Sequence, residues 1–196
     1  PFNPAMVGYA VLIISFPAYM THWKAPLGLG QTDLTLMQQL GYIFGGQFPA
    51  GITVDAVSMA TPLDTLKTQL HSAHSISDIF QMPVYGHIAG HGSEIVALGF
   101  VLGGIYLLLN RIISWHLPVT FLAALFATAG AFYLYDPSHY VQPLFHWFSG
   151  AAMLAAFFIL TDPVTSPTTL RGKFIFAAGA GFLTYIIRVF GGFPDG

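Results

Sequence analysis

Five long apolar runs divide this sequence, and they restrict its fold more than any other feature. Helices are expected at residues 5–21, 92–110, 117–135, 144–160 and 174–190. Each run is about 17–19 residues long, enough for an α-helix to cross a bilayer core of about 30 Å. Only 7% of the 196 residues are charged, whereas soluble domains carry about 25% charged residues. The sequence therefore predicts an all-α polytopic membrane protein with about five transmembrane helices.

The uneven spacing of these runs sets the predicted division of the chain. Residues 1–22 are expected to form one transmembrane helix, residues 23–91 a long loop, and residues 92–196 a four-helix transmembrane region. A loop of this length without a function would be unusual. Within it, short helices are expected at residues 34–44, 62–71 and 76–82. Because the chain opens without an initiator methionine, we interpret it as a piece of a longer polypeptide.

The positive charges predict an orientation. Arg111, Arg171 and Lys173 lie in short connections that alternate with the long loop and with the loop at Asp136. Because Lys and Arg favour the cytoplasmic side, the short connections are expected there. The loop 23–91 is then expected on the outer, periplasmic side.

Composition also excludes several kinds of partner and cofactor within this chain. The net charge is −2, which gives no sign of nucleic-acid binding. The sequence has no cysteine, so it holds no disulfide, thiolate-bound iron–sulfur cluster or thioether-linked haem. Any such centre would belong to a partner subunit.

A polar stretch at residues 55–64 interrupts the long loop and has the pattern of a helix start. Thr61 suits the N-cap, Pro62 the first helical position, and Asp64 the first turn, where a carboxylate faces the positive end of the helix dipole. One interpretation is that Thr61 is a cap and nothing more. The other is that its hydroxyl carries a phosphate ester, since helix N-termini also bind phosphate. Both need the same local geometry, so the pattern leaves both open.

A resemblance favours the second interpretation. Asp55-x-x-Ser58-x-Ala60-Thr61 resembles the acceptor motif at which flavin transferases attach FMN to threonine through its phosphate. This motif is known in the ion-pumping Rnf and Nqr electron-transfer complexes. The position before Ala60, often glycine in such motifs, is Met59 here. The longer run 58–68 resembles the NqrB/RnfD family, as do residues 1–9, 161–172 and 188–196, so the resemblance covers the chain end to end.

The resemblance implies a specific function and set of partners. The chain would be part of a membrane subunit of an ion-translocating ferredoxin:NAD oxidoreductase in the bacterial inner membrane. It would carry electrons through FMN on Thr61, coupled to Na⁺ or H⁺ transport, with Asp55, Ser58 and Ala60 in the motif read by the flavin transferase. Iron–sulfur and second flavin subunits, other membrane subunits and lipid would be its partners.

The family also implies a fold like that of urea transporters, with two related halves around a central path. This chain would be one half, part of the other, and the long flavin-carrying loop. Relatives hold a non-covalent riboflavin, for which Asn3 and Asp162 are polar candidates near helix ends. Two rival functions remain: an NqrB-like subunit of a quinone reductase, and a flavin-free membrane transporter or channel.

Asp162 also has a simpler interpretation. The segment 161–169 has the pattern of a helix stop and restart, with Ser166 as the cap and Pro167 at the first helical position. Alternatively, it is broken backbone at a membrane cavity, where a carboxylate could hold an ion or a cofactor edge.

The remaining polar residues are expected to be structural. Two histidine pairs, His71 with His74 and His87 with His91, have helical spacing, but the glycines around the second pair disfavour a helix. Loop or interface positions are therefore the favoured interpretation over a metal site. Glu94 and Arg188 lie at the ends of apolar runs, from which long side chains are expected to reach the polar interface.

Overall fold

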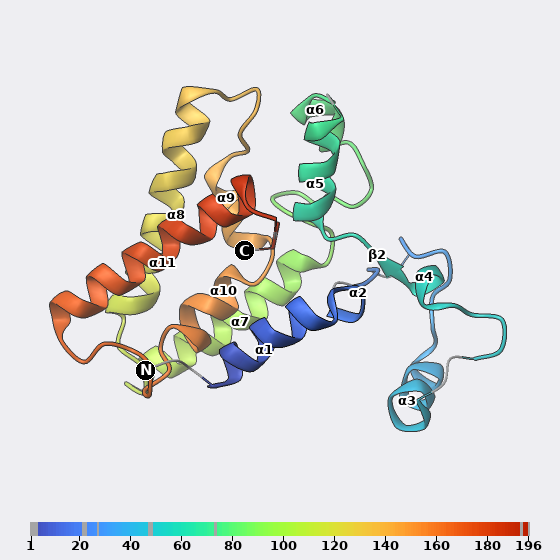
Figure 1. Ribbon diagram of the computed structural model, residues 1–196, viewed down its shortest axis with the longest axis horizontal. Coiled ribbons are helices and arrows are strands. Elements are labelled where there is room, and N and C mark those ends of the chain that lie inside the picture. Colours follow the sequence, from blue (N-terminus) through green and yellow to red (C-terminus); the bar gives the residue numbers. More distant parts are fainter. Residues whose placement is uncertain are drawn as a thin grey trace. The chain divides into compact units, whose positions relative to one another are not determined.

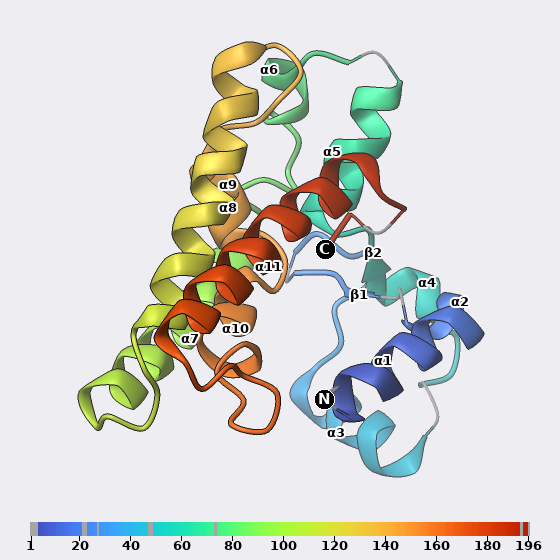
Figure 2. The same cartoon turned by 60° about the vertical axis from the view of Figure 1, so that its left-hand side comes forward.

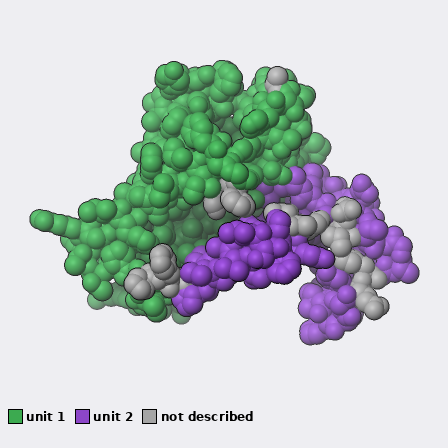
Figure 3. Space-filling model, in the orientation of Figure 1, with its two compact units in different colours: residues 1, 62–196 green, residues 2–61 purple. Residues whose placement is uncertain are grey.

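The computed structural model describes residues 4–20, 23–26, 28–46, 49–72, 74–192 and 194–195. The chain forms two compact units, one of residues 2–61 and one of residues 62–196 with residue 1, coloured separately in Figure 3. The described parts are mostly helical, in agreement with the predicted all-α class.

The unit of residues 2–61 contains short helices and one small β-ladder. Its elements are α1 (Pro4–Ser15), α2 (Pro17–Met20), β1 (Trp23–Lys24), α3 (Leu36–Gly45), α4 (Val54–Val57) and β2 (Ser58–Met59). The predicted run 5–21 is interrupted at Phe16, because Pro17 has no N–H for a continuing helical ladder. Thr35 and Gln38 form a reciprocal capping box that fixes the start of α3.

The unit of residues 62–196 contains the longer helices (Figure 1). Its elements are α5 (Pro62–His71), α6 (Ile76–Ile79), α7 (Ser93–Leu109), α8 (His116–Tyr135), α9 (Pro143–Phe148), α10 (Ala152–Leu154), the π-helix η1 (Ala155–Ile159) and α11 (Leu170–Phe190).

Two of these helices, α8 and α11, are long and apolar enough to cross a membrane, and α1 and α7 are shorter apolar helices. Large apolar side chains cover much of their outer surface, with Ile95 76% exposed, Ile175 75% and Leu134 82%. Such a surface is unfavourable in water but suits lipid. The protein is thus a helical membrane protein, and the number of five crossings stays a prediction.

Glycines let the long helices approach closely. A Cβ on Gly181 of α11 would lie 2.5 Å from the carbonyl oxygen of Phe121 in α8, so these two backbones are in contact. A Cβ on Gly104 of α7 would overlap the ring of Phe157 in η1. Small residues at helix crossings are typical of packing in membranes. The crossing of α11 over α8 is visible in both Figure 1 and Figure 2.

The expected helix 144–160 differs from the observed structure. It is divided after Phe148, where Ser149 is extended and Gly150 has a φ of +61°, a conformation that favours glycine. The chain then continues as α10 and η1. The prediction that Ser166 caps the last helix with Pro167 at its first position is also wrong. Thr169 is the cap, and its hydroxyl accepts a hydrogen bond from Gly172 N.

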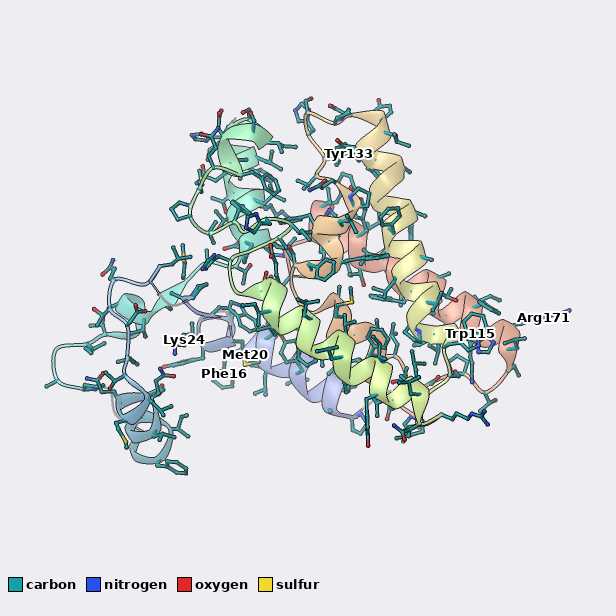
Figure 4. All side chains as sticks on the ribbon, turned by 180° about the vertical axis from the view of Figure 1, so that it is seen from behind. Phe16, Met20, Lys24, Trp115, Tyr133 and Arg171 are labelled. Atoms are coloured by element: carbon teal, nitrogen blue, oxygen red, sulfur yellow. The ribbon has the colours of Figure 1, made fainter. Side chains whose placement is uncertain are left out.

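The connections of the larger unit gather at opposite ends. Lys173 Nζ donates to Ser114 Oγ at 3.2 Å, which joins the starts of α8 and α11. The segments around Arg111 and Ser166 line one cleft of about 360 Å³ at this end. Figure 4 shows Trp115 and Arg171 at this end and Tyr133 toward the other end of α8. The two connections predicted to share a side therefore lie together.

Candidate functional site

The polar motif at residues 55–61 is held by a β-ladder that the sequence did not predict. Met59 pairs with Trp23 and Ser58 with Lys24 in the antiparallel strands β2 and β1. Two further backbone bonds extend the pairing: Ala25 N donates to Val57 O at 2.9 Å, and Thr32 N to Ala56 O at 3.1 Å. A strand of two residues is too short to show the alternation of apolar and polar residues by which strands are predicted from a sequence. The motif is therefore ordered backbone rather than an open loop.

The motif residues lie in sequence order between this ladder and the next helix. Ser58 is half-buried in β2, Ala60 is exposed, and Thr61 is half-buried directly before α5. The backbone of Asp55 lies in α4, and its side chain lies outside what the structure describes, as does all of Asn3.

Helix α5 has the bounds predicted from the sequence, Pro62–His71. Asp64 lies in its first turn, and Leu63 and Leu66 are buried. One turn farther on, Lys67 donates from Nζ to the carbonyl oxygen of Gly191, beyond the end of α11. Apolar burial and one cationic contact therefore fix this helix against the unit it belongs to.

The first residue of α5 is clamped by residues that no pattern in the sequence singled out. The Tyr85 hydroxyl donates to the Pro62 carbonyl oxygen at 3.0 Å. A Cβ on Gly90 would overlap the ring of Pro62, so the proline lies directly on the glycine backbone. Burial raises the pKa of the Tyr85 phenol, which keeps the hydroxyl protonated as a donor. The residue following Thr61 therefore has a fixed position within its unit.

The clamp is built on a tight turn. Tyr85 and Gly90 form an antiparallel bridge, and Gly86 N donates to Ala89 O at 2.7 Å. Glu94 Oε1 closes the turn by accepting from Ile88 N and Ala89 N, each at 2.8 Å. The Glu94 carboxylate therefore caps the turn that precedes α7, and its position relative to the polar interface stays a prediction.

The two histidine pairs lie in different local structures, one at the end of α5 and one in the turn before α7. His87 and His91 lie in the turn and not in a helix, as predicted. His71 Nδ1 lies 2.7 Å from the Lys67 carbonyl oxygen in its own helix. Within the described part of the chain, no three or more His, Cys, Asp or Glu side chains gather as metal ligands would.

Arg188 differs most from its expected role. It is only 4% exposed, so the prediction that it reaches the interface is wrong. Its Nη1 donates to His146 O at 2.7 Å and its Nη2 to Ser149 O at 3.3 Å. These carbonyls lie at the end of α9, where helical carbonyls lack partners in the next turn. Arg188 therefore joins α11 to the break in the expected helix 144–160.

Asp162 forms a local turn. Its Oδ2 accepts from Thr165 N at 3.2 Å and from Thr165 Oγ1 at 2.8 Å. This bonding supports the interpretation of a helix stop, in which a carboxylate orders the connection to α11. Its proposed contact with riboflavin stays a prediction.

Together, the apolar helices, their lipid-compatible surface and their glycine-mediated crossings define a helical, multi-pass membrane protein. Comparison with known sequences adds its family. The model of the NQR2, RnfD, RnfE family matches residues 1–196, and the chain belongs to that family.

The curated relatives that match include proteins from Salmonella paratyphi B, Salmonella typhi and Salmonella typhimurium. Each is 48% identical to this chain over 204 aligned residues and is named as the D subunit of an ion-translocating oxidoreductase complex. The match covers 100% of this chain and 58% of each relative. The chain therefore spans somewhat more than half the length of these relatives.

Proposed function

We propose that this chain belongs to the membrane subunit of an Rnf-type, ion-translocating ferredoxin:NAD oxidoreductase and carries FMN on Thr61. The observation that carries the proposal is the family match, which spans the chain. In addition, Thr61, the candidate FMN acceptor, directly precedes a helix whose first residue is clamped by Tyr85 and Gly90. Because the chain covers 58% of its relatives, the activity of the whole complex is part of the proposal. That activity would couple electron transfer to Na⁺ or H⁺ transport in the bacterial inner membrane.

The residues around Thr61 fit a tethered phosphate. The first amides of a helix lack intrahelical partners and bind phosphate oxygens well. Pro62 removes one of these donors, and the Asp64 carboxylate adds a like charge to the first turn. Charge attraction alone would therefore hold a phosphate weakly here, so the proposal rests on a covalent bond to the Thr61 hydroxyl.

The bound flavin would supply the redox chemistry, and the chain would position it. Ser58 and Asp55 would be read by the flavin transferase along with Ala60, which is exposed. The ladder of β1 and β2 fixes the backbone on one side of Thr61. The proposal also includes a non-covalent riboflavin, for which Asn3 and Asp162 are candidate contacts. Its partners would be iron–sulfur and second flavin subunits, and Thr61 would lie on the periplasmic side.

The test is attachment of flavin to the purified full-length protein. After expression together with the flavin transferase, the protein should remain fluorescent on a denaturing gel, and its mass should rise by one FMN less water. Thr61→Ala should remove both signals while the protein still inserts into the membrane. Thr53→Ala is the matched control, since Thr53 also directly precedes a short helix. A wild-type protein of unmodified mass under these conditions would refute the assignment.

The family model also includes NQR2, so a quinone-reductase subunit is a second candidate. The curated relatives are named as D subunits, which favours the first candidate, because the family description pairs that letter with Rnf. The two differ in the reaction of the assembled complex: ferredoxin-linked reduction of NAD supports the Rnf-type function, and quinone reduction by NADH supports the other.

A further inference from the structure

A cavity of about 80 Å³ lies within the unit of residues 62–196, where α5 meets the ends of α9 and α11. Leu63 and Leu66 form part of its apolar wall. Its polar lining includes Lys67, His71, His139, His146, Tyr185 and Arg188. Of the described residues that line it, none is acidic. The cavity therefore presents donors and positive charge.

Two groups in this lining are buried without a hydrogen-bond partner among the described residues. They are the Tyr185 hydroxyl and His146 Nδ1, on side chains whose residues are 0% and 3% exposed. A buried polar group that lacks a partner costs about 1–3 kcal/mol. A ligand that accepts hydrogen bonds in this cavity would remove that cost for the Tyr185 hydroxyl directly, and for the His146 nitrogen in its protonated tautomer.

The cations beside these groups are bonded to neutral acceptors. Lys67 Nζ donates to the Gly191 carbonyl oxygen. Arg188 donates to the carbonyl oxygens of His146, Ser149 and Asp195. Carbonyl oxygens satisfy N–H donors but leave the positive charges of Lys67 and Arg188 in place.

Two carboxylates lie near the cavity but do not line it. The Asp195 carboxylate attracts the Arg188 guanidinium electrostatically. The Asp136 carboxylate accepts from Ser138 N and lies 2.8 Å from His139 Nδ1. The described lining therefore contains the two permanent cations Lys67 and Arg188 and no acidic side chain.

We propose that this cavity binds a small, anionic group rich in hydrogen-bond acceptors. A single water needs about 10–15 Å³ of such volume, so the cavity has room for a group of a few non-hydrogen atoms. Two sources can supply such acceptors: a free carboxylate, which is anionic throughout, and the pyrimidine edge of the flavin proposed on Thr61, which is neutral when the flavin is oxidised and anionic at N1 when it is reduced. Only the second source rests on the proposed function.

The probe is formate, titrated into the purified full-length protein at constant ionic strength against a bulky sulfonate. The readout is the thermal unfolding midpoint, which rises when a ligand binds the folded state. Formate should raise it in a saturable way in the flavin-free Thr61→Ala protein. Lys67→Gln keeps a donor for the Gly191 carbonyl but loses the charge, and should weaken formate binding at least tenfold. Tyr185→Phe should weaken it severalfold.

Lys173→Gln is the matched control, because Lys173 lies at the opposite end of α11 and outside this cavity. It should bind formate as the parent protein does. No saturable rise, or a rise equal in the parent, Lys67→Gln and Lys173→Gln, would overturn the proposal and leave a cavity that holds water only.

The flavin-loaded protein identifies the source. If a free anion is the occupant, formate stabilises the loaded and flavin-free proteins alike. If the flavin edge is the occupant, formate stabilises only the flavin-free protein, and Lys67→Gln shifts the absorption spectrum of the loaded protein. Failure of flavin attachment would refute the proposed function but leave the formate titration of the unmodified protein as a complete test.

Discussion

The two ends of the larger unit hold their charged groups in different ways. At the end near Arg111 and Ser166, Lys173 is bonded to a hydroxyl beside a cleft of about 360 Å³. At the α5 end, Arg188 is buried and Lys67 half-buried, both bonded to backbone carbonyls, around a cavity of about 80 Å³. Charges bonded to backbone fix helices relative to one another, whereas charges at an open cleft keep their solvation. The α5 end is thus the one whose cations join separate segments through backbone carbonyls, and it holds the helix that follows the candidate flavin residue.

The largest expected effect comes from removing the buried cation. Arg188→Met keeps the volume but leaves the carbonyls of His146 and Ser149 without their donors, and it should lower the free energy of unfolding by about 3 kcal/mol. Thermal unfolding followed by tryptophan fluorescence in detergent measures this loss. Arg171→Met, on the exposed start of the same helix, should change it by less than about 0.5 kcal/mol. Equal losses would show that the two ends do not differ.

A smaller loss is expected from the clamp on Pro62. Gly90→Ala puts a methyl group where the proline ring lies, and overpacking of this kind costs about 1–3 kcal/mol. Because Pro62 must move, covalent flavin per folded molecule should fall as well. Gly99→Ala is the matched control, since nothing lies within 4 Å of its added Cβ. Unchanged stability and flavin content in Gly90→Ala would mean that the start of α5 is not clamped.

The sequence predicts those parts of this arrangement that depend on neighbouring residues. The bounds of α5 follow from Thr61, Pro62 and the pattern after them. Long apolar runs identify α8 and α11, because their length and composition are local properties. The interpretation of His87 and His91 as loop residues also rests on adjacent glycines.

The parts that were missed depend on distant backbone. The acceptors of Arg188 are carbonyls 42 and 39 residues away, so its burial has no local signal. The contact of Gly90 with Pro62 likewise joins two segments that are separate in sequence. The glycines at positions 86, 90 and 92 were the one available sign of close backbone approach. Attachment of FMN, the riboflavin contacts and the membrane orientation stay predictions.

The smallest expected effect tests the clamp through one hydrogen bond and through pH. Tyr85→Phe removes the bond from the hydroxyl to the Pro62 carbonyl and should cost about 1 kcal/mol at neutral pH. The pKa of Tyr85 is raised by burial. The folded state therefore holds this proton more tightly than the unfolded state, in which the phenol has a pKa of about 10. The stabilising contribution is complete below that value and is lost as the pH rises above it.

The comparison of wild type with Tyr85→Phe isolates this group from other groups that titrate at alkaline pH. Between about pH 8 and pH 11, the unfolding midpoint of the wild type should fall more steeply than that of the variant, because only the wild type must ionise a buried phenol on unfolding. The two curves should therefore converge as the pH rises. Parallel curves would mean that the Tyr85 hydroxyl is solvated, and the position of α5 would then rest on its buried leucines and on the contacts of Gly90 and Lys67.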